Sequence, residues 1–230
     1  MRLVVISDVH GRQDWKRITA QNKDADLFIF LGDYFDSFDI HANEQILNFQ
    51  EIILFKEKNP DKVILLTGNH DTHYLPYFIN AGERYSGFQG SMFHEISLLI
   101  QANLAYLQMA FQYNDILFTH AGVTNTWLND NGFDKKDDVV KFINDLFIYK
   151  PSAFRFVGFD PYGDSKHSSP VWVRPRSLMS NAYKYDEVRQ VVGHTQHKRI
   201  TIVKDRYCFT DAPDSKEYLS IIDNQFMISS

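Results

Sequence analysis

The feature that most constrains the fold is a pattern that the first part of the chain shows three times: an apolar run of four or five residues that ends in a cluster of polar side chains. The runs span residues 3–6, 27–31 and 63–66. Short apolar runs that end at turn-forming residues are typical of buried parallel strands. Helical spacing over 14–22 and 43–58 separates the runs. This alternation predicts an α/β fold with a largely parallel sheet at this end of the chain.

The polar clusters contain residue types that bind metal ions. In chain order they are Asp8 with His10, Asp33 with Asp36, and Asn69 with His70. Open α/β sheets place their ligands at the carboxyl ends of parallel strands, so we expect the three clusters to meet at one edge of the sheet. Taken alone, the first cluster is also the pattern of a turn in which Asp8 caps a helix, and short motifs carry a high false-positive risk.

The rest of the chain continues the mixture of helices and strands. We expect a surface loop over 74–90, helices over 92–107 and 137–147 (the second capped by Asp137), and strands over 109–113, 116–119, 187–192, 200–203, 207–210 and 218–228. Asn114-Asp115 and Asp223-Asn224 are predicted hairpin turns. Residues 150–170 lack periodicity, and a long irregular segment in a compact domain is often functional. Because no linker-like segment interrupts these elements, we expect one domain over residues 1–230.

Composition narrows the function classes. The net charge of −5 gives no basic excess for sequence-independent binding of nucleic acid. Cys208 is the only cysteine, so no disulfide can form within the chain. No segment approaches the roughly 20 apolar residues of a membrane span. We therefore expect a cytoplasmic protein with no membrane partner and no strong nucleic-acid partner.

Two later strand ends add imidazole groups. His120 follows the run 116–119, and His194 follows the run 187–192, with His197 three residues further on. Carboxylate, amide and imidazole ligands together suit manganese, iron or zinc better than calcium or magnesium. A shared carboxylate such as Asp33 can bridge two ions that lie ~3.5–4 Å apart, the arrangement used for displacement at phosphorus.

Five motifs in this order resemble the calcineurin-like metallophosphoesterases. They are Asp8-Val-His10, Gly32-Asp33-Tyr-Phe-Asp36, Gly68-Asn-His-Asp71, Thr119-His120-Ala-Gly122 and Gly193-His194-Thr195. The segments 118–122 and 170–176 look more like the phosphoprotein phosphatase and diadenosine tetraphosphatase branch, in its small bacterial or phage form. The resemblance implies two packed, mostly mixed β-sheets flanked by helices, that is, an α/β fold.

The resemblance also implies a role for each matching residue. Asp8, His10 and Asp33 would hold the first of two divalent ions, with manganese favoured and iron or zinc as alternatives. Asp33, Asn69, His120 and His194 would hold the second. A hydroxide bridging both ions would attack phosphorus in line, while His70, oriented by Asp36, would protonate the leaving oxygen. Arg174, and with less support Arg176, would bind the phosphoryl group.

The chain also departs from the family pattern. Ser37 and Thr67 occupy positions where family members often have arginine, so Arg174 becomes the main candidate for holding phosphate. His197 lies one residue further from His194 than in the Gly-His-x-His motif of other members, which argues against its being a ligand. Four histidines have no motif around them, and we expect ordinary surface or core roles for them: His41, His73, His94 and His167. His41 and His73 lie nearest the expected site, so contact with substrate is the alternative for these two.

These features predict a dinuclear-metal phosphoesterase, with a phosphomonoesterase as the first interpretation. The alternative is a phosphodiesterase or dinucleoside polyphosphate hydrolase on the same site, with the segment 150–170 controlling access. A third interpretation is a metal-bound scaffold without catalysis. The presence of His70 with Asp36 argues against the scaffold, because a binding module needs no positioned acid. The expected partner is a phosphorylated small molecule, nucleotide or protein, and the sequence does not determine the oligomeric state.

Overall fold

The computed structural model describes residues 1–157 and 164–230, so residues 158–163 of the irregular segment expected over 150–170 lie outside the described residues. In the larger sheet of the described part, the strands lie in the order β11 (Gln225–Ser229), β10 (Tyr218–Ile222), β1 (Arg2–Ile6), β2 (Leu27–Phe30), β3 (Val63–Leu66) and β4 (Leu107–Gln108). The strands β1 to β4 are parallel, β10 joins β1 antiparallel, and β11 pairs antiparallel with β10. The parallel strands expected from the three apolar runs are therefore confirmed.

The smaller sheet has the strand order β5 (Ala110–Tyr113), β6 (Ile116–Thr119), β7 (Arg189–Val192), β9 (Tyr207–Phe209) and β8 (Thr201–Val203). The central strands β6, β7 and β9 are parallel, while β5 and β8 form antiparallel edges. Both sheets are thus mixed. Within each sheet, the parallel strands bring the carboxyl ends of several strands to one edge.

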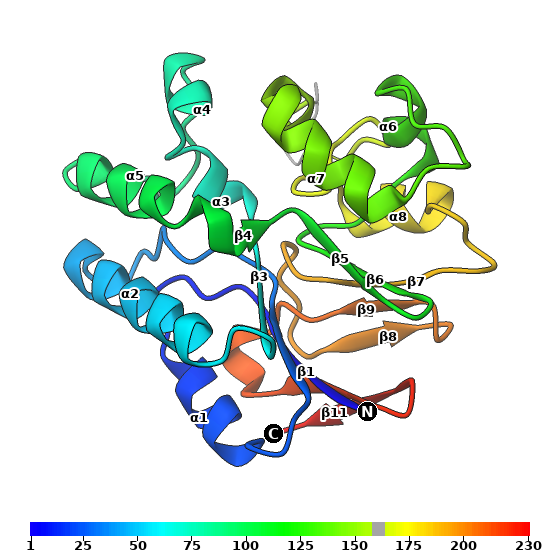
Figure 1. The fold of residues 1–230 in the computed structure, drawn as a ribbon, viewed down its shortest axis with the longest axis horizontal. Helices are drawn as coiled ribbons and strands as arrows, with labels where there is room; N and C mark the ends of the chain where they lie inside the picture. Colours follow the sequence, from blue (N-terminus) through cyan, green and yellow to red (C-terminus); the bar gives the residue numbers. More distant parts are fainter. Residues whose placement is uncertain (158–163) are drawn as a thin grey trace.

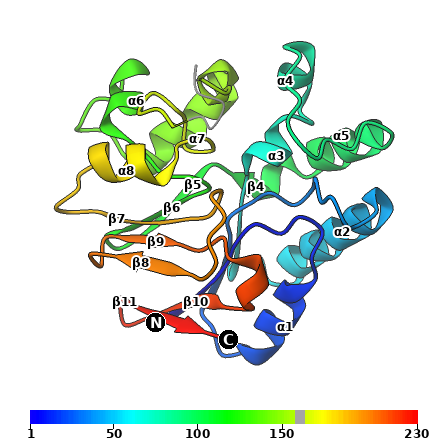
Figure 2. The same cartoon turned by 180° about the vertical axis from the view of Figure 1, so that it is seen from behind.

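Helices cover the outer faces of both sheets. They are α1 (Asp14–Gln21), α2 (Ala42–Lys58), α3 (Asn69–Thr72), α4 (Pro76–Asn80), α5 (Phe93–Ala102), α6 (Asn125–Asp130), α7 (Val139–Tyr149) and α8 (Pro175–Asn181). Figure 1, and Figure 2 from behind, show α1, α2 and α5 beside the larger sheet and α6, α7 and α8 over the smaller sheet. No helix of the described residues is both long and apolar enough to cross a bilayer.

Alternate residues of the strands of the larger sheet form two hydrophobic layers. One face packs against the smaller sheet in a core that contains Leu3, Val5, Ile29, Phe118, Val191 and Cys208. The other face packs against the helices in a core that contains Val4, Phe28, Phe30, Trp15, Ile18, Phe49 and Ile52. Because successive strand residues point to opposite faces, a strand that is apolar throughout is buried on both sides, as the continuous apolar runs predict.

Four local expectations are corrected. The loop expected over 74–90 contains α4, and α6 and α8 are helices that the apolar spacing did not predict. The helix expected over 92–107 ends at Ala102, where Asn103 bonds back to the carbonyl of Leu99; the 3₁₀ turn Leu104–Tyr106 and β4 follow. The cap of α7 is Asp138 rather than Asp137, because its carboxylate accepts from the backbone N–H of Val140 and Lys141. Apolar spacing continued past the true end of α5, and the side-chain bonds of Asn103 and Asp138 mark where α5 ends and α7 begins.

An ion pair links the smaller sheet to the last hairpin of the larger sheet. Asp115, in the turn between β5 and β6, accepts hydrogen bonds from Nε and Nη2 of Arg189 at 2.7 and 3.1 Å. Its Oδ1 also accepts from Asn224, in the turn between β10 and β11, at 2.6 Å. The hydrogen bonds from Arg189 lower the pKa of Asp115 from 3.8 to about 2. This carboxylate therefore stabilises the folded chain above that pH.

We expect Asp115→Asn to lower the free energy of unfolding by about 1–2 kcal/mol at pH 7. The Arg189 side chain is 7% exposed and loses its charged partner, while the 35% exposure of Asp115 lets water screen the pair. Because the pKa is lowered on folding, the difference should shrink as the pH falls from about 4 through about 2. Thermal unfolding measured at pH 7 and again near pH 2 tests this. Asp223→Asn serves as the control, because the side chain of Asp223 lies nearby and is 85% exposed. Equal midpoints for Asp115→Asn and the unmodified chain at pH 7 would contradict it.

Candidate metal centre

The residues expected to bind metal lie at strand ends that meet at one edge of the two sheets. Asp8 and His10 follow β1, Asp33 follows β2, Asn69 begins α3 just after β3, His120 follows β6, and His194 follows β7. The larger sheet contributes the first four of these residues and the smaller sheet the last two. Residues from both sheets therefore form one cluster.

Hydrogen bonds between these residues join the two sheets. The side-chain oxygen of Asn69 lies 2.9 Å from Nε2 of His120 and 2.9 Å from Nδ1 of His194. The backbone N–H of His194 donates to Oδ2 of Asp8 at 2.9 Å. Oδ2 of Asp33 lies 3.4 Å from Nε2 of His120 and 3.7 Å from Nε2 of His10. Asp33 thus faces imidazoles on both sides, which is the position a shared ligand requires.

The imidazoles of His10, His120 and His194 each have one ring nitrogen facing the cluster and the other beside a backbone carbonyl. Nδ1 of His10 lies 2.6 Å from the carbonyl of Phe35, and Nδ1 of His120 lies 2.9 Å from that of Leu31. Nε2 of His194 lies 3.2 Å from the carbonyl of Trp172. Metal-ligating histidines are characteristically held in this way, because the carbonyl fixes the proton on the outer nitrogen and leaves the inner lone pair for the ion.

The backbone is strained at three residues of the cluster and at Asp36, three residues after Asp33. His10, Asp33, Asp36 and His194 have φ values of 42°, 52°, 69° and 66°. Residues other than glycine adopt this left-handed region rarely, and such residues concentrate at active sites where the surroundings hold them. The strain turns the chain sharply at the strand ends, so that these side chains face the common edge.

Two glycines allow the carboxylates to approach the backbone closely. A Cβ atom on Gly193 would lie 2.0 Å from Oδ1 of Asp8, and a Cβ on Gly68 would lie 2.0 Å from Oδ1 of Asp33. Any larger residue at either position would displace a carboxylate of the cluster. The two glycines beside His194 and Asn69 are therefore structural requirements of the centre.

The charges of the centre are unbalanced without a cation. Burial raises the pKa of Asp8 to about 6. Burial opposes the charged form of His120, but the negative charges of Asp33 and Asp8 outweigh it and raise the pKa of His120 to about 10. Burial and the positive charges of His120 and Arg174 hold the pKa of His194 well below its ordinary value. A divalent cation can therefore replace the proton on His120 and neutralise the two carboxylates.

The donor set fits a metal centre. One oxygen of Asp8, one oxygen of Asp33 and one ring nitrogen of His120 all lie within 4.8 Å of one another. Asn69 contacts His120, and His10 lies beside Asp33, so the remaining expected ligands surround this group. His10 and His120 therefore both lie beside the same carboxylate oxygen of Asp33.

A second group of side chains surrounds Asp36, which is 2% exposed. Oδ2 of Asp36 lies 2.8 Å from Nδ1 of His70 and 2.6 Å from Nε2 of His73, and Oδ1 accepts from the hydroxyl of Tyr74. Burial opposes ionisation of Asp36, yet the hydrogen bonds from the two histidines lower its pKa. Burial opposes the charged form of His70, yet Asp33 and Asp36 raise its pKa. His70 is thus held in place with a partner that favours its protonated form.

His73 was expected to have an ordinary core or surface role, and the structure shows that it lies against the pair that was expected to act as the acid. It is completely buried, and its ring packs against Tyr85 and Phe88. The sequence signal was its position three residues after His70, near the expected site. The single turn of α3 brings both imidazoles to Asp36. Another missed residue is Asp211, which follows β9 at the same edge; the strand-end pattern would have indicated it.

An open cavity of about 390 Å³ lies over the centre. Its lining includes Asp8, His10, Asp33, Asn69, His70, His194 and Asp211 together with Tyr85, Phe156, Trp172 and Arg174. The ring of Trp172 contacts those of Tyr85 and Phe156 edge-on, with centroids 4.4 and 5.0 Å apart. The cavity therefore has a polar floor and an aromatic wall.

The two arginines expected to bind phosphate, Arg174 and Arg176, differ in their position relative to the cavity. Arg174 precedes α8, lines the cavity, and donates from Nη1 to the carbonyl of His194 at 3.3 Å and to Thr195 at 3.2 Å. Arg176, two residues later, is exposed and is not among the residues that line the cavity, so its position favours Arg174 over Arg176 as the phosphate-binding residue. Ser37 and Thr67 are both buried, which leaves Arg174 as the arginine at the cavity among the described residues.

His197 differs from His194 in its surroundings. Its ring stacks on Phe209 with centroids 5.4 Å apart, and it does not line the cavity. The wider spacing in the sequence carries the ring past the edge where the other imidazoles converge. This placement agrees with the expectation that His197 is not a ligand.

Comparisons with known proteins agree with this picture. The sequence matches the family model described as calcineurin-like phosphoesterase over residues 1–198. None of the curated proteins compared with the chain matches it. The structure is similar to that of the cold-active protein-tyrosine phosphatase of the psychrophile Shewanella sp., with a TM-score of 0.67, 19% identity, and coverage of 99% of this chain and 77% of that chain. Another cold-active protein tyrosine phosphatase structure has a TM-score of 0.62 and 21% identity, covering 99% of this chain and 75% of that chain. The predicted fold class, two mixed sheets flanked by helices, is confirmed.

Proposed function

The chain belongs to the calcineurin-like phosphoesterase family and is a metal-dependent hydrolase of phosphoric esters, and we propose that within this family it is a phosphomonoesterase. The family depends on two metal ions, and the cluster at the sheet edge offers the ligands for them. We further infer that residues 1–230 act as one domain, because strand ends from both sheets contribute to the same cluster. The proposed activity requires metal ligands, a proton donor and a phosphate-binding group, and the cavity offers a candidate for each.

The proposed ligands divide around Asp33. Asp8, His10 and Asp33 hold the first ion, and Asp33, Asn69, His120 and His194 hold the second, with manganese preferred for this mixture of oxygen and nitrogen donors. When bound, the ions supply an activated water and neutralise the charge of the phosphoryl group. The support is the position of Asp33 between His10 and His120 and the carbonyl partner of each imidazole.

His70 is proposed to give the leaving oxygen its proton. Its ring lines the cavity, and its Nδ1 is held by Asp36, so Nε2 is the atom free to donate toward the substrate. Asp33 and Asp36 favour the protonated ring against the effect of burial on its pKa. An ester of a poor leaving group needs this proton, because an alkoxide is too basic to depart unaided.

The observation that carries the preference for monoesters is the cavity itself. Its volume of about 390 Å³ is near the lower end of the usual range for ligand sites. A phosphoryl group with one ring-sized substituent suits this space better than the two large groups of a dinucleoside polyphosphate. The aromatic wall of Tyr85, Phe156 and Trp172 favours an aryl substituent, and the similar Shewanella protein is called a protein-tyrosine phosphatase.

A substrate panel tests the proposal. The manganese-loaded chain is assayed with phenyl phosphate, a phosphotyrosine peptide, an alkyl phosphate, bis(p-nitrophenyl) phosphate and a dinucleoside polyphosphate. We expect a higher kcat/KM for the monoesters, and among them for the aryl esters. A higher kcat/KM for the diester or the polyphosphate would favour the alternative function, and no turnover of any ester would leave only a binding role.

Arg174 provides a further prediction about phosphate recognition. We expect Arg174→Ala to lower kcat/KM for a phosphomonoester by about 10–150-fold, the effect of losing hydrogen bonds from a charged group. Arg174→Lys should lose less, because it keeps the charge but not the planar fork that matches phosphate. Both variants should retain their metal. The exposed Arg176→Ala is the matched control and should behave as the unmodified chain; a larger loss there than at Arg174 would assign the phosphate contact to Arg176.

A further inference from the structure

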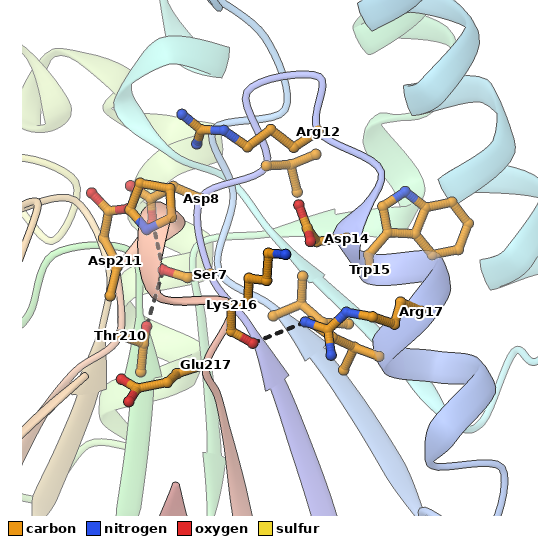
Figure 3. Close-up of a pocket in the computed structure, with 15 residues that line it drawn as sticks. Ser7, Asp8, Arg12, Asp14, Trp15, Arg17, Thr210, Asp211, Lys216 and Glu217 are labelled. Carbon is orange, nitrogen blue, oxygen red and sulfur yellow. Dashed lines mark hydrogen bonds between the residues drawn. The ribbon is translucent and has the colours of Figure 1, made fainter. Parts of the chain in front are cut away.

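Asp211 is a buried carboxylate to which the proposed function assigns no role. It follows β9 at the edge where the expected ligands converge, and its side chain lines the cavity over the centre. It also lines a small neighbouring cavity, in which Figure 3 shows its carboxylate pointing toward that of Asp8. Asp211 is 7% exposed, and within the described residues its carboxylate oxygens accept no hydrogen bond and form no ion pair.

A buried carboxylate without a partner is expensive to keep. Within the described residues its carboxylate accepts no hydrogen bond that would offset its desolvation. Asp8 and Asp33, which line the same cavity, add like charge, and the positive charges of His120 and Arg174 offset this only in part. Among the described residues, the backbone carbonyl of Asp211 accepts from the N–H of His197 at 2.7 Å, and this bond does not depend on the side chain. The side chain therefore makes the folded chain less stable unless something positive binds beside it.

We propose that Asp211 is an outer carboxylate of the ion position formed by Asp8 and His10, where its charge strengthens the binding of a divalent cation. Asp8, His10 and Asp33 already supply the proposed direct ligands of this position, and the oxygens of Asp211 lie outside the group of Asp8, Asp33 and His120 whose ligand atoms are within 4.8 Å of one another. In the proposed role Asp211 therefore acts through its charge and through water. Outer partners of this kind hold water and orient ligands around an ion. The inference rests on the metal positions of the proposed function.

If Asp211 has this role, the substitution Asp211→Asn should stabilise the metal-free chain and weaken its binding of Mn²⁺. Asp211→Asn keeps the shape of the side chain and removes its charge. The metal-free variant should unfold at a higher temperature than the metal-free unmodified chain, because the crowding of three carboxylates is relieved. The same variant should bind Mn²⁺ about 10–100-fold more weakly at one of two positions. A residue with a merely structural role would instead lower the unfolding temperature and leave Mn²⁺ affinity unchanged.

The experiment uses the full chain, stripped of metal and titrated with MnCl₂, with free Mn²⁺ followed by electron paramagnetic resonance and unfolding followed by calorimetry. Asp214→Asn, an exposed carboxylate three residues further on, is the matched control and should change neither measurement. If the unmodified chain binds two Mn²⁺ ions and Asp211→Asn binds both with unchanged affinity, the role of Asp211 is overturned while the proposed function stands. A metal-free Asp211→Asn less stable than the unmodified chain also overturns it. If the unmodified chain binds no Mn²⁺, the metal positions themselves fail.

Discussion

Asp33→Asn should reduce phosphoesterase activity by at least about 10³-fold and leave the chain with fewer than two bound ions. Asp33 lies 3.4 Å from His120 and 3.7 Å from His10, so it is the residue placed to bridge both positions. Asparagine keeps the shape, and its oxygen can still accept from the backbone N–H of His70, as Oδ1 of Asp33 does at 2.9 Å. What it loses is the charge that would bind two cations, and metal ions supply several kcal/mol of transition-state stabilisation.

The measurement is kcat/KM together with metal content by elemental analysis. Asp39→Asn, an exposed carboxylate in the segment that follows β2, serves as the matched control and should keep both activity and metal. Removal of metal from the unmodified chain by chelation should produce the same loss, and Mn²⁺ should restore activity. Full activity after exhaustive chelation, or in Asp33→Asn, would rule out a mechanism that depends on two ions.

His70→Asn should lower kcat for an alkyl phosphate by about 10²–10⁴-fold, with a much smaller loss for p-nitrophenyl phosphate. The reason is that p-nitrophenolate leaves without a proton, whereas an alkoxide does not. KM should change little, because His70 is proposed to act on the leaving group rather than to bind the phosphoryl group. Asp36→Asn should show the same dependence on the leaving group with a smaller loss, since Asp36 lies 2.8 Å from Nδ1 of His70 and orients the ring.

Steady-state kinetics with both esters on each variant test this assignment. His94→Asn, an exposed histidine on α5, is the matched control and should leave both rates unchanged. Metal content should stay at the level of the unmodified chain in all three variants, which separates a missing proton from a missing ion. Equal losses of kcat for the alkyl and p-nitrophenyl esters would show that His70 is not the acid.

The proposed ligands and the parallel strands of the sheet were predictable because each depends on a short, continuous segment of the sequence. A buried parallel strand is a local apolar run, and its carboxyl end is where the next polar residue must lie, so Asp8, Asp33 and Asn69 could be placed on one edge from the sequence. His120 and His194 follow the same rule in the smaller sheet. The boundaries of helices depended on caps such as Asn103 and Asp138, whose bonds apolar spacing does not reveal.

The tertiary structure alone decided how these groups face one another. The sequence cannot show which ring nitrogen of His194 faces Asn69, because the carbonyl of Trp172, 22 residues away, fixes the ring. His73 reaches Asp36 only because the chain after β2 and the helix after β3 fold against each other.

Asp211 and Arg176 also show that tertiary packing, and not the sequence pattern alone, determines which residues reach the cavity. Asp211 joins the centre because β9 lies beside β7, although 203 residues separate it from Asp8 in the chain. Arg176 belongs to a matching segment, yet it lies inside α8 and does not line the cavity that Arg174 reaches from the start of that helix. Patterns along the chain determine which residue types lie at a strand end, whereas the packing of distant segments determines which of them meet.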